Sequence, residues 1–121
     1  MLSILLVVNL IADYFLQNRE VAEKKSIHIK YLLFHGIIIF FSFLLAITLM
    51  VNMKVAFMFA TIYSVIHCVQ DWYIWRLYKR IRRDRITLDY EYWKDSLFYS
   101  FIGTDMTLHI ITIIILMGLL L

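Results

Sequence analysis

Three aspartates and three histidines lie inside apolar stretches of this chain: Asp13, His35, His67, Asp71, Asp105 and His109. An ionisable side chain within a membrane-spanning segment is costly to bury, and it is by default a candidate functional group. Carboxylates combined with imidazoles are typical ligands of divalent transition metals, and a balanced mixture favours zinc, manganese or iron. The residue types therefore predict a site for one or two such ions. We expect five of the six side chains to be metal ligands, with Asp13 either a further ligand or the catalytic general base.

The spacing of these residues supports a shared site. His67 and Asp71 are four residues apart, as are Asp105 and His109. Four residues is slightly more than one turn of an α-helix, so each pair lies on one helix face. A polar stripe on an otherwise apolar membrane helix faces the interior of a helix bundle or a water-filled cavity.

The N-terminal apolar stretch repeats the same interval with Asn9, Asp13 and Gln17. Amide side chains one turn away from a metal ligand can orient that ligand through hydrogen bonds. We therefore expect Asn9 and Gln17 to act as hydrogen-bonding residues around the metal site rather than as ligands.

Hydrophobic residues make up 63% of the 121-residue chain, and the mean hydropathy is +0.79. These values exceed what a water-soluble domain of this size carries. A helix needs roughly 20 apolar residues to cross the hydrocarbon core. The sequence predicts an all-α fold, a four-helix transmembrane bundle formed by a single domain over residues 1–121. The expected spans are about 1–17, 31–53, 55–76 and 100–121, with loops at about 18–30 and 77–96.

Basic residues indicate the orientation of the bundle. Eleven of the twelve lysines and arginines lie in the segments 17–30 and 76–95. The positive-inside rule places these segments in the cytoplasm and both termini on the non-cytoplasmic side. Each of the six ionisable side chains then lies about one to three helical turns from a cytoplasmic boundary. Groups at a similar depth on four helices can converge in one cavity.

Four sequence runs resemble the domain of unknown function 3307 family. They are NLIADYFLQNREVAEKK, LLFHG, YSVIHCVQDWYIWRL and GTDMTLHIITIII, and together they cover nearly the whole chain. The resemblance implies a small multi-pass membrane protein of a bacterium or phage, in the bacterial cytoplasmic (inner) membrane. It also implies that the family's polar positions are Asp13, Gln17, His35, His67, Asp71, Asp105 and His109.

Two positions depart from the pattern of this family. Asn9 stands where the family usually has a histidine, and Met106 stands where it usually has a glutamine. A ligand set that depended on the first histidine would be reduced in this chain. The family resemblance supplies no activity, so the function has to be argued from the site.

The pattern of inward His and Asp side chains in a small bundle is distantly similar to membrane-bound metal-dependent hydrolases of bacteria. This resemblance implies metal-dependent hydrolysis of a lipid or of a lipid-linked phosphate or ester. A metal ion can lower the pKa of a bound water toward neutrality, and a carboxylate such as Asp13 can accept its proton. The basic run 76–85 could attract anionic lipid head groups, although such runs more often only determine topology. No recognised nucleic-acid-binding motif accompanies it, so a nucleic-acid partner is not expected.

Three alternatives stay open. A bundle with inward Asp and His side chains could conduct protons or divalent ions, in that case as a homo-oligomer. A small membrane protein could instead be a non-enzymatic interaction partner in a bacterium or its phage. Finally, any single His–Asp pair is more often an interhelical hydrogen bond than part of a metal site. Only the presence of all six at one depth favours the metal site.

Overall fold

Every regular element of the described residues, 1–83 and 90–121 of a computed structural model, is a helix. The all-α fold expected from the sequence is thus confirmed. In chain order the elements are α1 (Leu2–Leu10), the π-helical turn η1 (Ile11–Phe15), α2 (Arg19–Lys24), α3 (Ile29–Thr48), α4 (Met53–Ile81), the 3-10 turn η2 (Tyr92–Lys94) and α5 (Ser96–Leu120).

Three of these helices, α3, α4 and α5, are long and apolar enough to cross a membrane. The N-terminal helical segment Leu2–Phe15 is apolar but shorter than the other three. The chain therefore has the features of a membrane protein. The fourth span and the side of the membrane on which the termini lie stay predictions.

The long helices do not end where the predicted spans do. Helix α3 ends at Thr48 rather than near residue 53, because a turn follows it and Asn52 caps the next helix by accepting a hydrogen bond from the Val55 backbone N–H. Helix α4 continues past the predicted end at residue 76 as far as Ile81.

Helix α5 begins at Ser96, earlier than the predicted start near residue 100. Asp95 caps this helix: its carboxylate accepts a hydrogen bond from the Leu97 backbone N–H and others from Tyr78, Tyr90 and Arg82. These donors hold the pKa of Asp95 well below its usual range. The cap therefore stays charged and ties the start of α5 to the end of α4.

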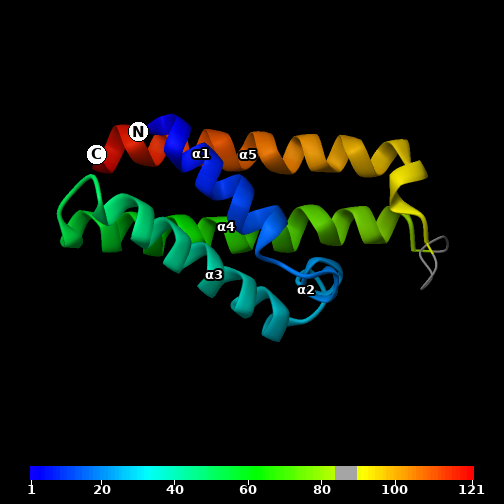
Figure 1. Cartoon of the computed structure of the whole chain (residues 1–121). Helices are drawn as coiled ribbons and strands as arrows, with labels where there is room; N and C mark the ends of the chain where they lie inside the picture. The colour runs from blue at the N-terminus through cyan, green and yellow to red at the C-terminus, as the bar shows by residue number, and fades with distance from the viewer. Residues whose placement is uncertain (84–89) are drawn as a thin grey trace.

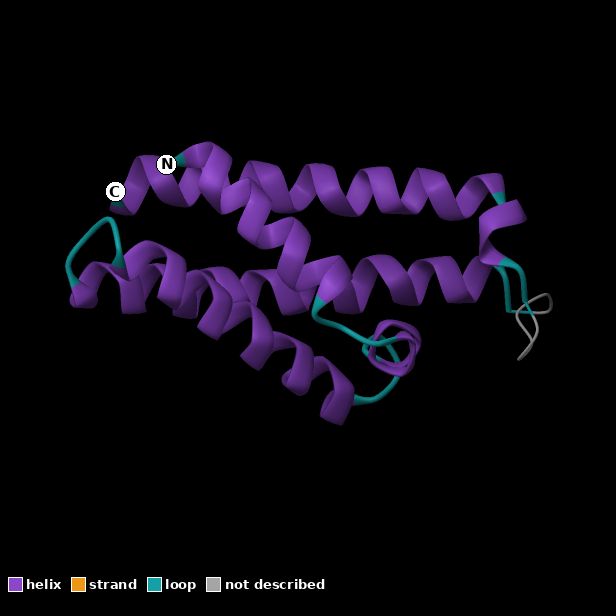
Figure 2. Ribbon diagram, viewed as in Figure 1, coloured by secondary structure: helices purple, strands orange, loops and turns teal. Residues whose placement is uncertain are grey.

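The helices form one bundle whose two ends differ (Figures 1 and 2). Helices α4 and α5 run side by side in opposite directions, and α3 packs against α4. The N-terminal helix α1 lies across α3 and α5. Both termini and the α3–α4 turn lie at one end of the bundle, whereas α2 lies away from that end (Figure 1). We call these the terminal end and the α2 end.

The predicted loop 18–30 is not an open loop. Asn18 caps the short helix α2, and the following segment is fixed to the last turns of α4. Arg76 donates a hydrogen bond to the Ser26 carbonyl, and Lys79 donates to the Ser26 hydroxyl and the Glu23 carbonyl. Two cations of the basic run 76–85 therefore bind the α2 segment of the protein itself.

Buried apolar side chains fill the terminal end of the bundle. They include Leu5, Phe43, Ile47, Phe59 and Leu116. Burial of apolar surface in a lipid environment gives little hydrophobic gain between helices, so close packing has to hold them together. The six ionisable side chains lie on the other side of this apolar core, toward α2.

Gly36 lies at a close contact between α3 and α4. A Cβ atom at this position would lie 2.6 Å from the Cys68 sulfur. Small residues allow membrane helices to approach closely. Gly36 directly follows His35, and Cys68 directly follows His67, so the close approach brings these two histidines together.

We expect Gly36→Val to lower the thermal unfolding midpoint of the detergent-solubilised protein, because overpacking costs about 1–3 kcal/mol. Gly103→Val is the matched control, since nothing lies within 4 Å of a Cβ at Gly103 in helix α5. The Cys68→Ala background should recover part of the loss. Equal destabilisation by the two valine substitutions would show that the helix contact at Gly36 is not tight.

Candidate metal centre

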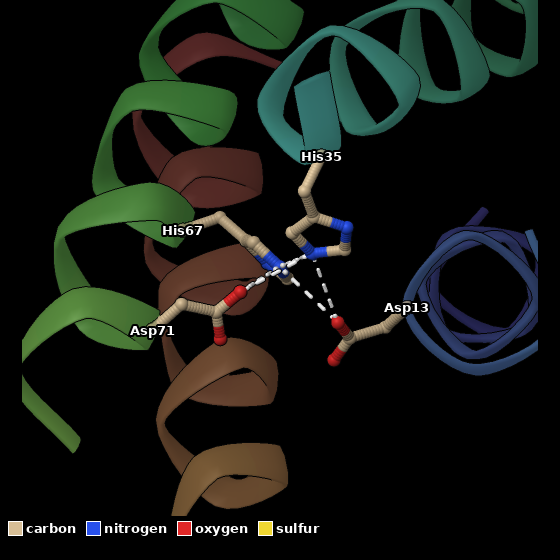
Figure 3. A group of neighbouring side chains, drawn as sticks. All are labelled: Asp13, His35, His67 and Asp71. Carbon is tan, nitrogen blue, oxygen red and sulfur yellow. Dashed lines mark hydrogen bonds and ion pairs between the residues drawn. The ribbon is translucent and has the colours of Figure 1, made fainter. Parts of the chain in front are cut away.

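Four of the six ionisable side chains meet at one point between three elements (Figure 3). Asp13 comes from η1, His35 from α3, and His67 and Asp71 from α4. All four are buried, with at most 1% of their surface exposed. The figure shows the four side chains pointing toward a common centre.

The atoms at this centre are two imidazole nitrogens and two carboxylate oxygens. The Nε2 atoms of His35 and His67 are 3.1 Å apart. Nε2 of His35 lies 3.1 Å from Asp13 Oδ1 and 3.2 Å from Asp71 Oδ2. Nε2 of His67 lies 3.4 Å and 3.3 Å from the same two oxygens. We call Asp13, His35, His67 and Asp71 the four-residue group.

These separations match a tetrahedral metal site. Ligand atoms about 2.0–2.1 Å from a tetrahedral ion are separated from one another by about 3.3–3.4 Å. The five distances that join a histidine nitrogen to another atom of the group are 3.1–3.4 Å. All four side chains offer a ligand atom within 4.8 Å of the others. The four-residue group could therefore hold a metal ion.

Tyr63 fixes the orientation and tautomer of His67. The Tyr63 hydroxyl donates a hydrogen bond of 2.5 Å to Asn9 Oδ1, so its oxygen is left to accept from Nδ1 of His67, 3.4 Å away. A neutral imidazole that donates from Nδ1 carries a lone pair on Nε2. The Nε2 lone pair of His67 is thus directed at the centre of the four-residue group.

Hydrogen bonds alone do not satisfy this centre. Within the group the carboxylate oxygens and Nε2 of His67 are all acceptors, so only His35 can offer an N–H. From outside the group, the ammonium of Lys25 lies 3.0 Å from Asp71 Oδ2 and 3.6 Å from Asp13 Oδ1. Asp13 Oδ1 and both oxygens of Asp71 have no hydrogen bond of good geometry among the described residues. A cation is the natural partner for such a set of lone pairs.

The remaining two ionisable side chains, both on α5, adjoin this group. Asp13, Asp105 and His109 form a second set of buried residues that could hold an ion. Nδ1 of His109 lies 3.6 Å from Asp13 Oδ2, and its Nε2 lies 3.5 Å from Asp105 Oδ1. We call these three the three-residue group. Asp13 belongs to both groups and turns one oxygen toward each of them.

Lys25 is a member of the cluster that sequence analysis did not predict. Its ammonium is 3.0 Å from Asp71 Oδ2 and 3.6 Å from Asp13 Oδ1, and the residue is 3% exposed. Burial acts to lower the pKa of Lys25, but the neighbouring carboxylates of Asp71 and Asp13 outweigh burial and raise it above its ordinary value. Lys25 therefore remains a buried cation.

The net charge of the cluster follows from the form in which its side chains would bind a metal, with the carboxylates ionised and the histidines neutral. In that form three carboxylates, Asp13, Asp71 and Asp105, face the ammonium of Lys25, which leaves two negative charges in a buried place. Uncompensated buried charges cost several kcal/mol each. One divalent ion would make the cluster neutral, and a second would leave it with two positive charges.

The backbone at Asp13 departs from a regular α-helix. The predicted stripe of Asn9, Asp13 and Gln17 assumed a regular α-helix, but the backbone widens to a π-helical turn at Ile11–Phe15. Such π-turns are rare and occur frequently at functional sites. Because the helix ends at Phe15, Gln17 lies outside it.

The two residues predicted to orient the ligands differ in their contacts. Asn9 is buried and acts through Tyr63, which was not predicted. The Gln17 Oε1 atom is buried and has no hydrogen bond among the described residues. Tyr63 lies four residues before His67, so the helical interval that paired His67 with Asp71 also pointed to Tyr63.

The basic run 76–85 is mostly engaged in protein contacts where the structure describes it. Arg82 pairs with Asp95 at 3.1 Å, in addition to the contacts of Arg76 and Lys79 with the α2 segment. Asp84 and Arg85 lie outside the described residues. The predicted attraction of anionic head groups by this run stays a prediction.

We expect Tyr63→Phe to weaken metal binding by about 10–100-fold, because hydrogen-bonding partners of ligating histidines contribute about that factor. Competition with a chromophoric chelator measures the affinity. Tyr73→Phe is the matched control, since Tyr73 lies on the same helix and is 69% exposed. An affinity unchanged by Tyr63→Phe would mean that Tyr63 does not support His67 as a ligand.

Comparisons with known proteins give a family but no activity. A search of curated proteins and a search of solved structures find no match. The family model described as protein of unknown function (DUF3307) matches residues 1–121, the whole chain. The chain belongs to the DUF3307 family.

Proposed function

We propose that this protein is a metal-dependent hydrolase of the membrane, acting on a lipid or lipid-linked substrate. The observation that carries the proposal is the tetrahedral spacing of four buried acceptor and imidazole atoms in the four-residue group. Two nitrogens and two oxygens suit zinc, manganese or iron, and tetrahedral geometry favours zinc among these.

The two groups would have different roles. Four protein ligands close a tetrahedral site, whereas catalytic sites typically have three protein ligands and an open position. We therefore assign a closed ion to the four-residue group and a catalytic ion to the three-residue group. An ion with an open position supplies an activated water and polarises the substrate.

Asp13 would act as a shared ligand rather than as the general base. Its Oδ1 lies within 3.4 Å of both histidine nitrogens of the four-residue group, and its Oδ2 is directed at His109. Neither oxygen is left over to accept a proton from water. Asp105 and His109 complete the three-residue group from helix α5.

The position of the apolar core argues against ion conduction. A conducting bundle needs polar groups through the full thickness of the membrane, but the buried side chains toward the terminal end include Phe43, Phe59 and Ile47. Among the described residues, a cavity lined by residues of the α2 segment adjoins the polar cluster. We propose, following the positive-inside rule, that the α2 end faces the cytoplasm.

Metal content tests the four-residue group directly. We expect His67→Ala to remove the closed ion, as measured by elemental analysis of protein purified without chelators or a histidine tag. His28→Ala is the matched control, because His28 is exposed and lies outside both groups. Metal content that is the same in both variants and in the unaltered protein would contradict the assignment.

The three-residue group is tested by Asp105→Asn. We expect this variant to lose one ion of two and to hydrolyse short-chain lipid phosphates and esters at the background rate only. Thr104→Ala serves as the control, since the exposed Thr104 hydroxyl bonds only the Ser100 carbonyl one turn earlier. Full turnover by Asp105→Asn would exclude the three-residue group as the catalytic site.

A further inference from the structure

A cavity of about 410 Å³ lies directly beside the three-residue group. Asp13, Asp105 and Lys25 line its inner part. Helix α1 packs against α5, whereas the backbones of η1 and α2 lie farther from α5, which η1 reaches through the side chain of Asp13. The cavity occupies the space that this separation leaves between the α2 segment and the first turns of α5.

The walls of the cavity are largely apolar and aromatic. Trp75 comes from α4, Trp93 from η2, and Phe98 and Ile102 from α5. Ala22 contributes a small side chain from the α2 side. Ligand sites of this size are typically apolar with a few polar groups placed at one end. The cavity has this composition, with its ionisable end at the metal centre.

The charge at the ionisable end of the cavity determines which kind of ligand can bind there. With both ions bound, the cluster and Lys25 together carry an excess of two positive charges. A phosphate monoester, which carries up to two negative charges, would neutralise this excess. A neutral carboxylic ester would leave the excess uncompensated in a buried place, which is costly.

Two further cations line the cavity besides Lys25. They are Lys79 from α4 and Arg19 from α2. Lys79 is bound to Ser26, while Arg19 is exposed and pairs at 2.9 Å with Glu23, which also lines the cavity. Lys25 is therefore the cation that adjoins the proposed ions.

We propose that this cavity binds a lipid phosphate, with the phosphate group against Lys25 and the ions and the apolar chain between Trp75, Phe98 and Ile102. The inference rests on the proposed metal-dependent function and names its substrate class. A water-soluble phosphate would leave the aromatic walls without a partner. A lipid without phosphate would leave the cationic end without one.

Binding to the metal-loaded, detergent-solubilised protein tests the proposal. The probe is dioctanoyl phosphatidic acid, measured by calorimetric titration, with dioctanoylglycerol and glycerol 3-phosphate as the lipid-only and phosphate-only comparisons. We expect the phosphatidic acid to bind at least about tenfold more tightly than either comparison. Equal binding of dioctanoylglycerol would overturn the phosphate site, and equal binding of glycerol 3-phosphate would overturn the apolar site.

Two substitutions fill the cavity from opposite walls without touching either metal group. Ile102→Trp and Ala22→Phe should each weaken phosphatidic acid binding by about tenfold or more and leave the metal content unchanged. Ile37→Trp is the control, since Ile37 lines a separate apolar hollow between α3 and α4. Retained metal in the cavity variants also shows that they are folded.

The outcomes separate this inference from the proposed function. Protein that binds no metal would overturn the proposed function itself. Metal-loaded protein that binds phosphatidic acid equally well in both cavity variants and in the control would overturn only the cavity as the lipid-phosphate site. Lys25→Gln adds an independent check: it should weaken binding of phosphatidic acid and leave the weak binding of dioctanoylglycerol as it is.

Discussion

The structure depends on one electrostatic constraint: buried carboxylate oxygens and the imidazole lone pair of His67 face one another at 3.3–3.4 Å inside an apolar bundle. Atoms that all present electron pairs repel unless cations lie among them. Lys25 supplies one positive charge at the edge of the cluster, and the proposed ion supplies the rest at its centre. The ammonium contacts Asp13 Oδ1 and Asp71 Oδ2, the same two oxygens that the proposed ion would use, so the two cations would share these carboxylates.

Several features of the fold serve to maintain this arrangement. Gly36 allows α3 and α4 to pack closely next to His35 and His67, and Asp13, on the π-turn Ile11–Phe15, contacts both groups through its two carboxylate oxygens. Arg76 and Lys79 fix the α2 segment on the end of α4, which keeps Lys25 inserted. Apolar packing closes the terminal end, so the cluster is reached from the α2 end through a cavity lined by aromatic side chains.

Sequence reasoning reached the helices and the chemistry of the cluster, but not its full membership. Hydropathy predicted α3, α4 and α5, and the four-residue interval placed His67 with Asp71 and Asp105 with His109, because both signals are local. Lys25 was taken as a loop cation, since only tertiary contacts between α2 and α4 carry it into the interior. The π-turn at Asp13 and the division of the six residues into two adjoining groups likewise follow from packing between helices, which no local pattern encodes.

The most direct test of the central claim is X-ray absorption spectroscopy at the edge of the metal found in the purified protein. An ion held by the four-residue group should show nitrogen and oxygen neighbours at about 2.0–2.1 Å, with the outer-sphere scattering of two imidazole rings. The signal of those rings should fall in His35→Ala. A sulfur neighbour at about 2.3 Å, or a spectrum of a fully hydrated ion without imidazole scattering, would contradict a metal centre built from Asp13, His35, His67 and Asp71.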